Sequence, residues 1–400
     1  MGKHKQEPKG SDGSTKVKKK AKTETSTSSL FTSIFGEETG LSGKDTPKDV
    51  FSSSTRWQEL AQERLSQNQQ KLKKNQESGL ASKVESDATK SKMVLKARKV
   101  LADSKTQVVA SITAHVPNYT PTTDEELEFG EKRMFIGRCD ATFRQNGVLI
   151  LKSLIARKVV KKLQRKATSI ESTLSRRLDK EGKLWRTKAD STKSAFSLKL
   201  EQEHAFRYHE VASRCFGRLD SRYLMDKPPF NHEEVVNNPW LKPLIHSLLG
   251  QDAKLVYTGL ILSYPDSADQ PWHQDGEALF GDAPVSDLPP YALNVFMPLR
   301  DISIELGPTE FWVGSHKESI CRDIMRTLQS DTNASSDQII GPLLQKGDVL
   351  IYDYRICHRG TRNLCTEEIR PMLYLMYARP WFHEHLNFGV DRLFQEQACT

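Results

Sequence analysis

Two residue types that bind metals stand two positions apart in the segment Trp272–Gly276, at His273 and Asp275. In a β-strand, residues i and i+2 point to the same side, so this imidazole and this carboxylate would project together. Fe(II) in non-haem oxygenases is held by two histidines and one carboxylate on one face, which leaves the other positions open. An H-x-D triplet also arises by chance, and the alternative is a surface histidine beside an aspartate in a turn. The pair therefore needs a third ligand.

His358 is the candidate for that third ligand. It follows the strand-like run 348–357 and precedes Arg359 and Gly360. Alternation along the run puts His358 on the same face as four apolar or aromatic residues, Leu350, Tyr352, Tyr354 and Ile356. A histidine at the end of such a strand suits the mouth of a barrel. The alternative is a histidine that only caps the strand.

Arg370 opens the next strand-like run. By alternation it shares a face with Met372, Tyr374 and Met376, which indicates an interior position. A buried arginine is costly without an anionic partner, and its planar guanidinium binds a carboxylate through two parallel hydrogen bonds. A dicarboxylic cosubstrate would supply that anion. The alternative is an ion pair with Glu367, Glu368 or another carboxylate of the protein.

The order of these four residues is more specific than any one of them. An H-x-D pair is followed after about eighty residues by a strand-end histidine, and then by an interior arginine one strand later. Together they predict an Fe(II) centre with a site for a dicarboxylate beside it.

The surrounding segments resemble the phytanoyl-CoA dioxygenase family of Fe(II)/2-oxoglutarate oxygenases. The similarity covers about residues 134–390 and is carried by 272–276, Gly307–His316 and His358–Asn363 with Arg370 and Pro371. It implies that His273, Asp275 and His358 bind Fe(II), and that Arg370 binds the distal carboxylate of 2-oxoglutarate. O2 would be the third reactant, and succinate and CO2 the co-products of hydroxylating an unidentified small molecule.

The resemblance also suggests two further contacts to the cosubstrate. Asn294 stands where related enzymes often place a polar contact. Many relatives have a serine or threonine two residues after the distal histidine. In this chain that position is Gly360, and Thr361 follows it as the candidate contact.

Other histidines are not expected to bind the metal. His316 lies among turn-forming residues, and the set of three ligands is complete without it, so we expect a structural role. His383 and His385 follow Pro380-Trp381-Phe382 and are expected outside the core.

The elements that must position these residues are mostly strands. Short strand-like runs separated by Gly, Pro and Asp begin at residue 254, namely Leu255–Ser263, Ala292–Leu299, Glu310–Val313, Asp348–Cys357 and Met372–Ala378. Before them, Asp140–Gly147 predicts a short helix, Val148–Leu151 a buried strand, and 153–225 and 239–250 mostly helix. We therefore expect a mainly β fold with flanking helices around a jelly-roll, cupin-like core. The family resemblance implies the double-stranded β-helix form of that core.

Composition divides the chain near residue 131. Only 37% of the residues are hydrophobic and 28% are charged, and the apolar runs follow residue 134. We expect residues 1–130 to be a disordered or partly helical basic extension and linker, with exposed helices within 55–110, and 131–400 to be the oxygenase domain.

The charge of +8 and the lysine run at 16–22 leave the cellular location open between cytoplasm and nucleus. No secretory signal, C-x-x-C pair or apolar run of membrane-spanning length is present in the sequence. The basic tail could contact nucleic acid, but it lacks interleaved aromatic residues, so a solvated tail is the simpler interpretation.

A non-catalytic barrel that serves as a binding module is the main alternative function. The oligomeric state is not predicted.

Overall fold

The computed structural model describes residues 83–117, 130–183, 185–186, 205–265, 267–276, 279, 288–317, 324, 338–384 and 387–394. All of them belong to the second of two compact units, Ser82–Thr400. The predicted disorder and import signal of the first 82 residues, and His385, lie outside the described residues. No helix in the described part of the chain is long and apolar enough to cross a membrane.

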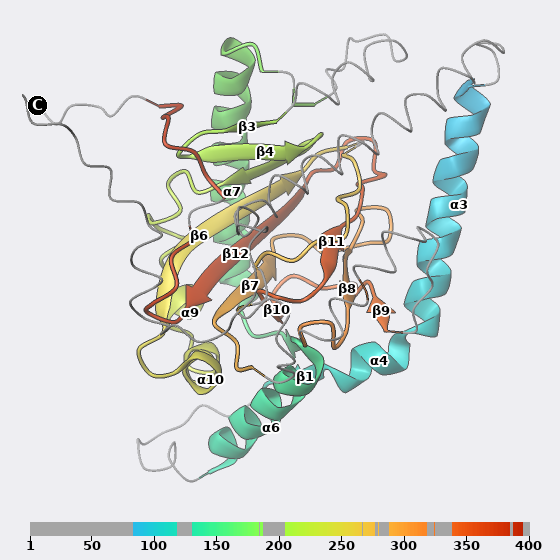
Figure 1. Cartoon of the computed structure of the whole chain (residues 1–400). Coiled ribbons are helices and arrows are strands. Elements are labelled where there is room, and N and C mark those ends of the chain that lie inside the picture. Colours follow the sequence, from blue (N-terminus) through green and yellow to red (C-terminus); the bar gives the residue numbers. More distant parts are fainter. Residues whose placement is uncertain are drawn as a thin grey trace, which may run out of the picture. The chain divides into compact units, whose positions relative to one another are not determined.

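Nine strands form one large sheet (Figure 1). Along the sheet their order is β1 (Thr113–His115), β2 (Val148–Lys152), β10 (Val349–Asp353), β7 (Ala292–Pro298), β12 (Arg370–Ala378), β6 (Lys254–Ser263), β5 (Arg218–Ser221), β4 (Val211–Cys215) and β3 (Phe206–Arg207). Neighbours pair antiparallel, except that β1 runs parallel to β2.

A second, three-stranded sheet packs against one face of the large one. It consists of β11 (His358–Gly360), β8 (Thr309–Trp312) and β9 (Ile339–Ile340). Phe311 of β8 lies 5.2 Å from Tyr352 of β10, ring centroid to ring centroid, and Ile340 joins the same buried cluster. The two facing sheets form the expected double-stranded β-helix core.

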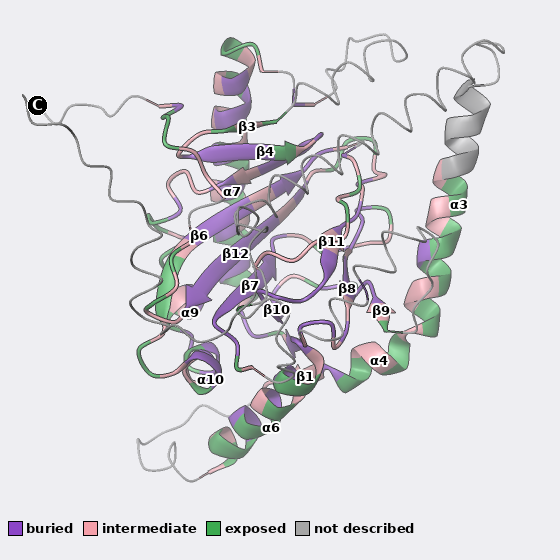
Figure 2. Cartoon of the chain, viewed as in Figure 1, coloured by how far each residue is buried: buried purple, intermediate pink, exposed green. Residues whose placement is uncertain are grey.

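Helices cover the other face of the large sheet. They are α6 (Glu131–Asn146), α7 (Arg157–Lys180), α9 (Glu233–Val236) and α10 (Leu241–Leu249). Alternation along β10 divides its side chains between the two layers: Val349 and Ile351 join the helix-side cluster, whereas Leu350 and Tyr352 face the small sheet. Figure 2 shows the central strands buried and the helices exposed on their outer sides. Burying each large apolar side chain contributes roughly 1.5–3 kcal/mol.

The helix that precedes β2 ends as expected at a glycine. Gly147 has φ of 73°, in the left-handed region, and its N–H donates to the carbonyl of Phe143 at 2.7 Å. A Cβ at this position would overlap the imidazole of His316. His316 is buried there with its Nε2 3.0 Å from the carbonyl oxygen of Arg144. The structural role predicted for His316 agrees with this packing.

The prediction that 153–225 is mostly helical is wrong for its last part. Helix α7 ends at Lys180, and residues 206–221 form β3, β4 and β5 at one edge of the large sheet. The sequence pattern does not indicate these strands because they are short and carry Arg214, Arg218 and Asp220. These polar side chains line a cavity, so the usual alternation of apolar and polar residues is lost.

The strand predicted over 348–357 is interrupted. The chain turns at Tyr354–Ile356, where the N–H of Ile356 donates to the carbonyl of Asp353 at 2.9 Å. A buried ion pair between Asp353 and Arg355, also 2.9 Å, closes the turn. His358 consequently lies on β11 in the small sheet, opposite the large sheet that carries Tyr352.

Two helices precede the sheet along the chain, α3 (Lys83–Ser104) and α4 (Thr106–Ser111). Helix was predicted within 55–110. Strand β1 then pairs with β2, so the sheet begins before the boundary predicted at residue 131.

Candidate metal centre

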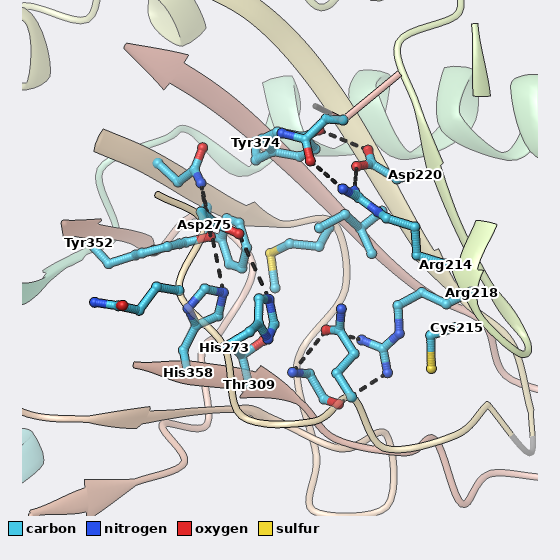
Figure 3. Close-up of a pocket in the computed structure, with 18 of the residues that line it drawn as sticks. Arg214, Cys215, Arg218, Asp220, His273, Asp275, Thr309, Tyr352, His358 and Tyr374 are labelled. Carbon is cyan, nitrogen blue, oxygen red and sulfur yellow. Dashed lines mark hydrogen bonds and ion pairs between the residues drawn. The ribbon is translucent and has the colours of Figure 1, made fainter. Parts of the chain in front are cut away.

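His273, Asp275 and His358 converge between the two sheets. One possible ligand atom from each lies within 4.8 Å of the others (Figure 3). The His358 Nε2 is 3.7 Å and the His273 Nε2 3.8 Å from the carboxylate of Asp275. The fold thus brings Asp275 and His358 together, although they stand 83 residues apart in the sequence.

Backbone pairing holds the two histidines side by side. The His273 N–H donates to the His358 carbonyl at 3.0 Å, and the His358 N–H donates to the His273 carbonyl at 2.9 Å. One residue past Asp275, the N–H of Gly276 donates to the Tyr354 carbonyl at 2.9 Å. A Cβ on Gly276 would overlap the rings of Tyr291 and Tyr354, so this close approach requires glycine.

Each imidazole is oriented by a backbone carbonyl. The Nδ1 of His273 lies 2.9 Å from the Pro271 oxygen, and the Nδ1 of His358 lies 3.1 Å from the Ile356 oxygen. A neutral imidazole that donates from Nδ1 carries its lone pair on Nε2. Both lone pairs then face the Asp275 carboxylate and the space between the rings.

Two side chains orient the carboxylate of Asp275. Its Oδ2 accepts hydrogen bonds from the Asn294 amide at 2.8 Å and from the Tyr352 hydroxyl at 2.9 Å. Burial by itself raises the pKa of Asp275, but the charges of His358 and His273 and the bond from Tyr352 bring the pKa below its ordinary value. The carboxylate is therefore ionised at neutral pH, as a metal ligand must be.

His273 is also in the form that a metal requires. Burial, followed by the charge of His358, lowers the pKa of His273 to about 4. Its imidazole is neutral at physiological pH. Two imidazoles and one carboxylate on one side of a shared space are the donor set that suits Fe(II) with open positions.

The three candidate ligands line a cavity of about 350 Å³. Arg370 lines it as well and is 3% exposed. Its guanidinium donates to the Ser263 hydroxyl at 3.0 Å and to the carbonyls of Leu306 and Thr361 at 3.4 Å. Among the described residues no carboxylate lies within ion-pair distance of Arg370.

The protein carboxylates considered as alternative partners of Arg370 either lie outside ion-pair distance of it or are paired with another residue. Glu368 forms an ion pair with Arg300 at 2.9 Å. Burial lowers the pKa of Arg370 well below its usual value, and the nearby charges of Arg218 and Arg98 lower it further. An anion bound in the cavity beside this guanidinium would offset that cost.

Arg218 is a residue of this site that the sequence did not reveal. It is buried, lines the cavity, and donates to the Gln270 side chain at 3.3 Å and to the carbonyls of Gly360 and Thr361 at 3.3 and 3.2 Å. Arg218 and Arg370 thus bond to one carbonyl, that of Thr361. Arg218 was missed because it is buried on a strand, whereas the stretch that contains it was interpreted as helix.

Asn294 and Thr361, the two further residues predicted to contact the cosubstrate, differ in whether they line the cavity. Asn294 lines the cavity, but its amide nitrogen is bonded to Asp275 and, at 3.0 Å, to the Tyr352 hydroxyl. The Thr361 hydroxyl donates to the Pro308 carbonyl at 2.7 Å, and Thr361 does not line the cavity. Thr309 lines it instead. His383 is exposed and stands apart from the three candidate ligands.

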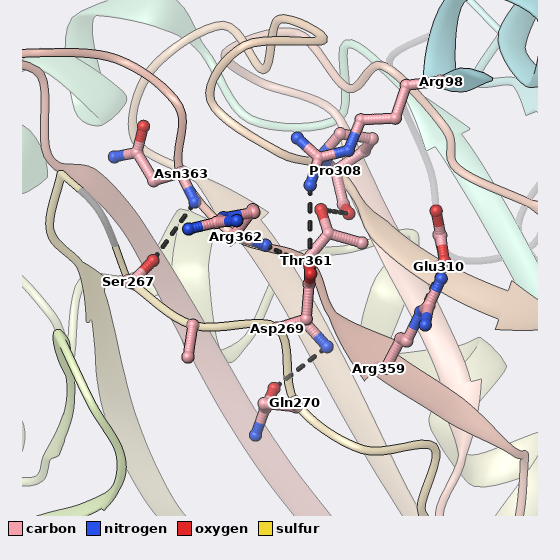
Figure 4. Close-up of polar contacts among 12 residues, drawn as sticks. Arg98, Ser267, Asp269, Gln270, Pro308, Glu310, Arg359, Thr361, Arg362 and Asn363 are labelled. Atoms are coloured by element: carbon pink, nitrogen blue, oxygen red, sulfur yellow. Dashed lines mark hydrogen bonds and ion pairs between the residues drawn. The ribbon is translucent and has the colours of Figure 1, made fainter. Parts of the chain in front are cut away.

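Helix α3 supports the cationic end of the cavity through Arg98 (Figure 4). Arg98 is 7% exposed and donates to the Ile304 carbonyl at 3.1 Å. It also lies 3.6 Å from Asp269, whose carboxylate accepts the N–H of Arg362 at 2.7 Å. The residue after Asp269 is Gln270, which accepts the N–H of Gly360 at 3.0 Å.

Substituting alanine for Arg98 is expected to lower the free energy of unfolding by about 1–3 kcal/mol, because buried polar partners lose their hydrogen bonds. It should also weaken 2-oxoglutarate binding severalfold, since the loop that carries Gln270 loses its support. Denaturant unfolding and cosubstrate titration measure the two effects. Lys99→Ala, at an exposed position of the same helix, is the matched control. Equal behaviour of the two variants would contradict a supporting role for Arg98.

The family is shown by comparison with known proteins. The family model described as phytanoyl-CoA dioxygenase matches residues 143–372, more than half of the chain. The chain belongs to the phytanoyl-CoA dioxygenase family, a family of Fe(II)- and 2-oxoglutarate-dependent dioxygenases, which confirms the predicted class, fold and cofactors. Helix α3 with Arg98 lies outside the matched residues.

Individual relatives are distant. The dioxygenase af480 of Aspergillus fumigatus is 22% identical over 193 residues, which are 45% of this chain and 59% of that protein. The chain thus spans less than two thirds of that relative. Among solved structures, HygX of Streptomyces hygroscopicus with nickel, 2-oxoglutarate and hygromycin B bound has a TM-score of 0.40 at 14% identity, over 63% of this chain and 94% of HygX. The α-ketoglutarate-dependent epimerase SnoN, from nogalamycin biosynthesis, has a TM-score of 0.40 at 15% identity, over 67% of this chain and 99% of SnoN.

Proposed function

We propose that this chain is an active Fe(II)- and 2-oxoglutarate-dependent dioxygenase that hydroxylates a small molecule. Its metal ligands are His273, Asp275 and His358, and Arg370 binds the distal carboxylate of 2-oxoglutarate. The observation that carries the proposal is the position of the buried Arg370 guanidinium, which lines the same cavity as the three candidate ligands and has no carboxylate partner among the described residues.

Fe(II) and 2-oxoglutarate, when bound, supply the oxidising chemistry that transfers one oxygen atom of O2 to a C–H bond and leaves succinate and CO2. The protein positions the groups that bind the metal and shields the reacting groups from water. The Pro271 and Ile356 carbonyls keep both imidazoles turned with Nε2 inward. Asn294 and Tyr352 hold one oxygen of Asp275, which leaves the other oxygen for the metal.

The cosubstrate end of the cavity is cationic and enclosed. Arg370 offers the planar fork that suits a carboxylate, and Arg218 adds a second buried positive charge beside it. Apolar side chains of Ile261, Phe296 and Met372 also line the cavity. They limit water near the reacting groups, which strengthens the electrostatic contacts there.

Release of succinate from 2-oxoglutarate tests this function directly. The protein with Fe(II), ascorbate and O2 is expected to release succinate slowly without a primary substrate and faster when a substrate is added. Heat-denatured protein serves as the blank. A chain that binds Fe(II) and 2-oxoglutarate but never releases succinate above this blank would favour the alternative, a non-catalytic binding module of the same fold.

A further inference from the structure

Two further arginines line the cavity besides Arg370 and Arg218. Arg207 and Arg214 come from β3 and β4. In Figure 3 the guanidinium of Arg214 lies beside Asp220 and Tyr374, apart from that of Arg218. Since Arg370 and Arg218 lie at the cosubstrate end, these two further arginines form a separate cationic region.

Arg214 is held in one orientation by polar partners. It forms an ion pair with Asp220 at 2.7 Å, and it donates to the side-chain oxygen of Asn387. Asp220 in turn accepts the Tyr374 hydroxyl at 2.8 Å. Asn387 donates to the hydroxyls of two tyrosines, Tyr257 at 3.2 Å and Tyr354 at 3.3 Å. A guanidinium has five N–H donors, and these two bonds leave Arg214 with donors for a ligand.

Acidic side chains stand near both arginines of this region. Asp220 is the ion-pair partner of Arg214, while Asp275 belongs to the candidate metal centre. Burial and then the charge of Arg214 lower the pKa of Arg207, and the charge of Glu384 offsets part of that effect. Bound at Arg370, 2-oxoglutarate would leave the remaining N–H donors of Arg214 for another ligand.

The side chain of Arg214 is also open to an incoming molecule. It is 39% exposed although it lines the cavity, whereas the Asp220 side chain behind it is 13% exposed. Arg214 lines the same cavity as Asp275 of the candidate metal centre. A molecule held at Arg214 would lie in the same cavity as the three ligands.

We propose that Arg214, supported by Arg207, binds an oxyanion group of the primary substrate, a carboxylate or a phosphate, and thereby orients the substrate toward the metal centre. This inference rests on the proposed function. It predicts an anionic, polar substrate class and assigns the Asp220 and Asn387 contacts to the orientation of the guanidinium.

Inorganic phosphate and acetate are suitable probes because the substrate is unidentified. The protein is first loaded with Co(II) and 2-oxoglutarate, and loading is verified by absorption spectroscopy. Paramagnetic Co(II) then broadens the phosphorus or proton resonance of a probe that binds nearby. Wild type is expected to show saturable broadening, and the tighter probe identifies the group as phosphate or carboxylate. Failure to load refutes the proposed function, whereas loaded protein without saturable probe binding refutes only this inference.

Two variants separate a binding role from a structural ion pair. Arg214→Gln should weaken probe binding about tenfold or more, because charge-assisted hydrogen bonds are lost. Asp220→Asn should retain most of the probe binding, because the asparagine oxygen can still accept a hydrogen bond from Arg214 while the competing negative charge is removed. Arg176→Gln, on the exposed side of α7, is the control and should match wild type. Unchanged binding in Arg214→Gln, or equal losses in Arg214→Gln and Asp220→Asn, would overturn the inference.

Discussion

Replacing His273 with alanine is expected to abolish Fe(II) binding and, with it, turnover of 2-oxoglutarate. The substitution leaves one imidazole and one carboxylate, which cannot fill three positions on one face of the metal. Changing a residue that merely supports a ligand already costs about ten- to a hundredfold in metal affinity, so loss of a ligand should exceed a hundredfold. Metal content after anaerobic loading and succinate release are the two measurements.

The matched control for this prediction is His383→Ala. His383 is exposed and lies outside the group of three candidate ligands, so this variant should bind Fe(II) and release succinate as wild type does. Thermal unfolding of the metal-free proteins verifies that both variants fold. Normal metal content in folded His273→Ala would show that the metal, if any, is held elsewhere.

Replacing Arg370 with lysine is expected to raise the 2-oxoglutarate concentration required for turnover by roughly ten- to a hundredfold, while Fe(II) binding persists. Lysine keeps the positive charge but loses the planar fork, which contributes about 1.5–3 kcal/mol to binding a carboxylate. The bonds of Arg370 to Ser263, Leu306 and Thr361 indicate that its guanidinium is fixed in position before the cosubstrate arrives.

Titrating 2-oxoglutarate against succinate release in wild type, Arg370→Lys and Arg300→Lys measures this effect. Arg300 is the control because its partner is a protein carboxylate, Glu368. Its replacement should leave the cosubstrate requirement near that of wild type. If Arg370→Lys required no more 2-oxoglutarate than the control, another residue would have to bind the distal carboxylate.

The candidate metal ligands could be proposed from the sequence because local geometry constrains them. His273 and Asp275 need only the alternation of an extended chain to face one side. Tyr352 was predicted to share a face with His358, and their ring centroids lie 4.9 Å apart even though the chain turns between them. The interior position predicted for Arg370 is also correct, with 3% of the residue exposed.

The remaining residues of the site could not be proposed, since long-range packing determines them. Arg214 and Arg218 lie on short strands near one edge of the large sheet, where polar side chains that line a cavity resemble side chains in solvent. Arg98 lies on a largely exposed helix, and its contact with Ile304 spans 206 residues of sequence. No periodicity of hydrophobic residues distinguishes such an arginine from its exposed neighbours.

Anaerobic addition of Fe(II) and then 2-oxoglutarate tests the central claim most directly, because chelation of the metal by the cosubstrate produces a charge-transfer absorption in the visible range. Wild type is expected to develop this band with one equivalent of each component, and the His273→Ala variant is expected to show none. A folded wild-type protein that binds neither component, or a band of equal strength in both proteins, would contradict a metal centre at His273, Asp275 and His358.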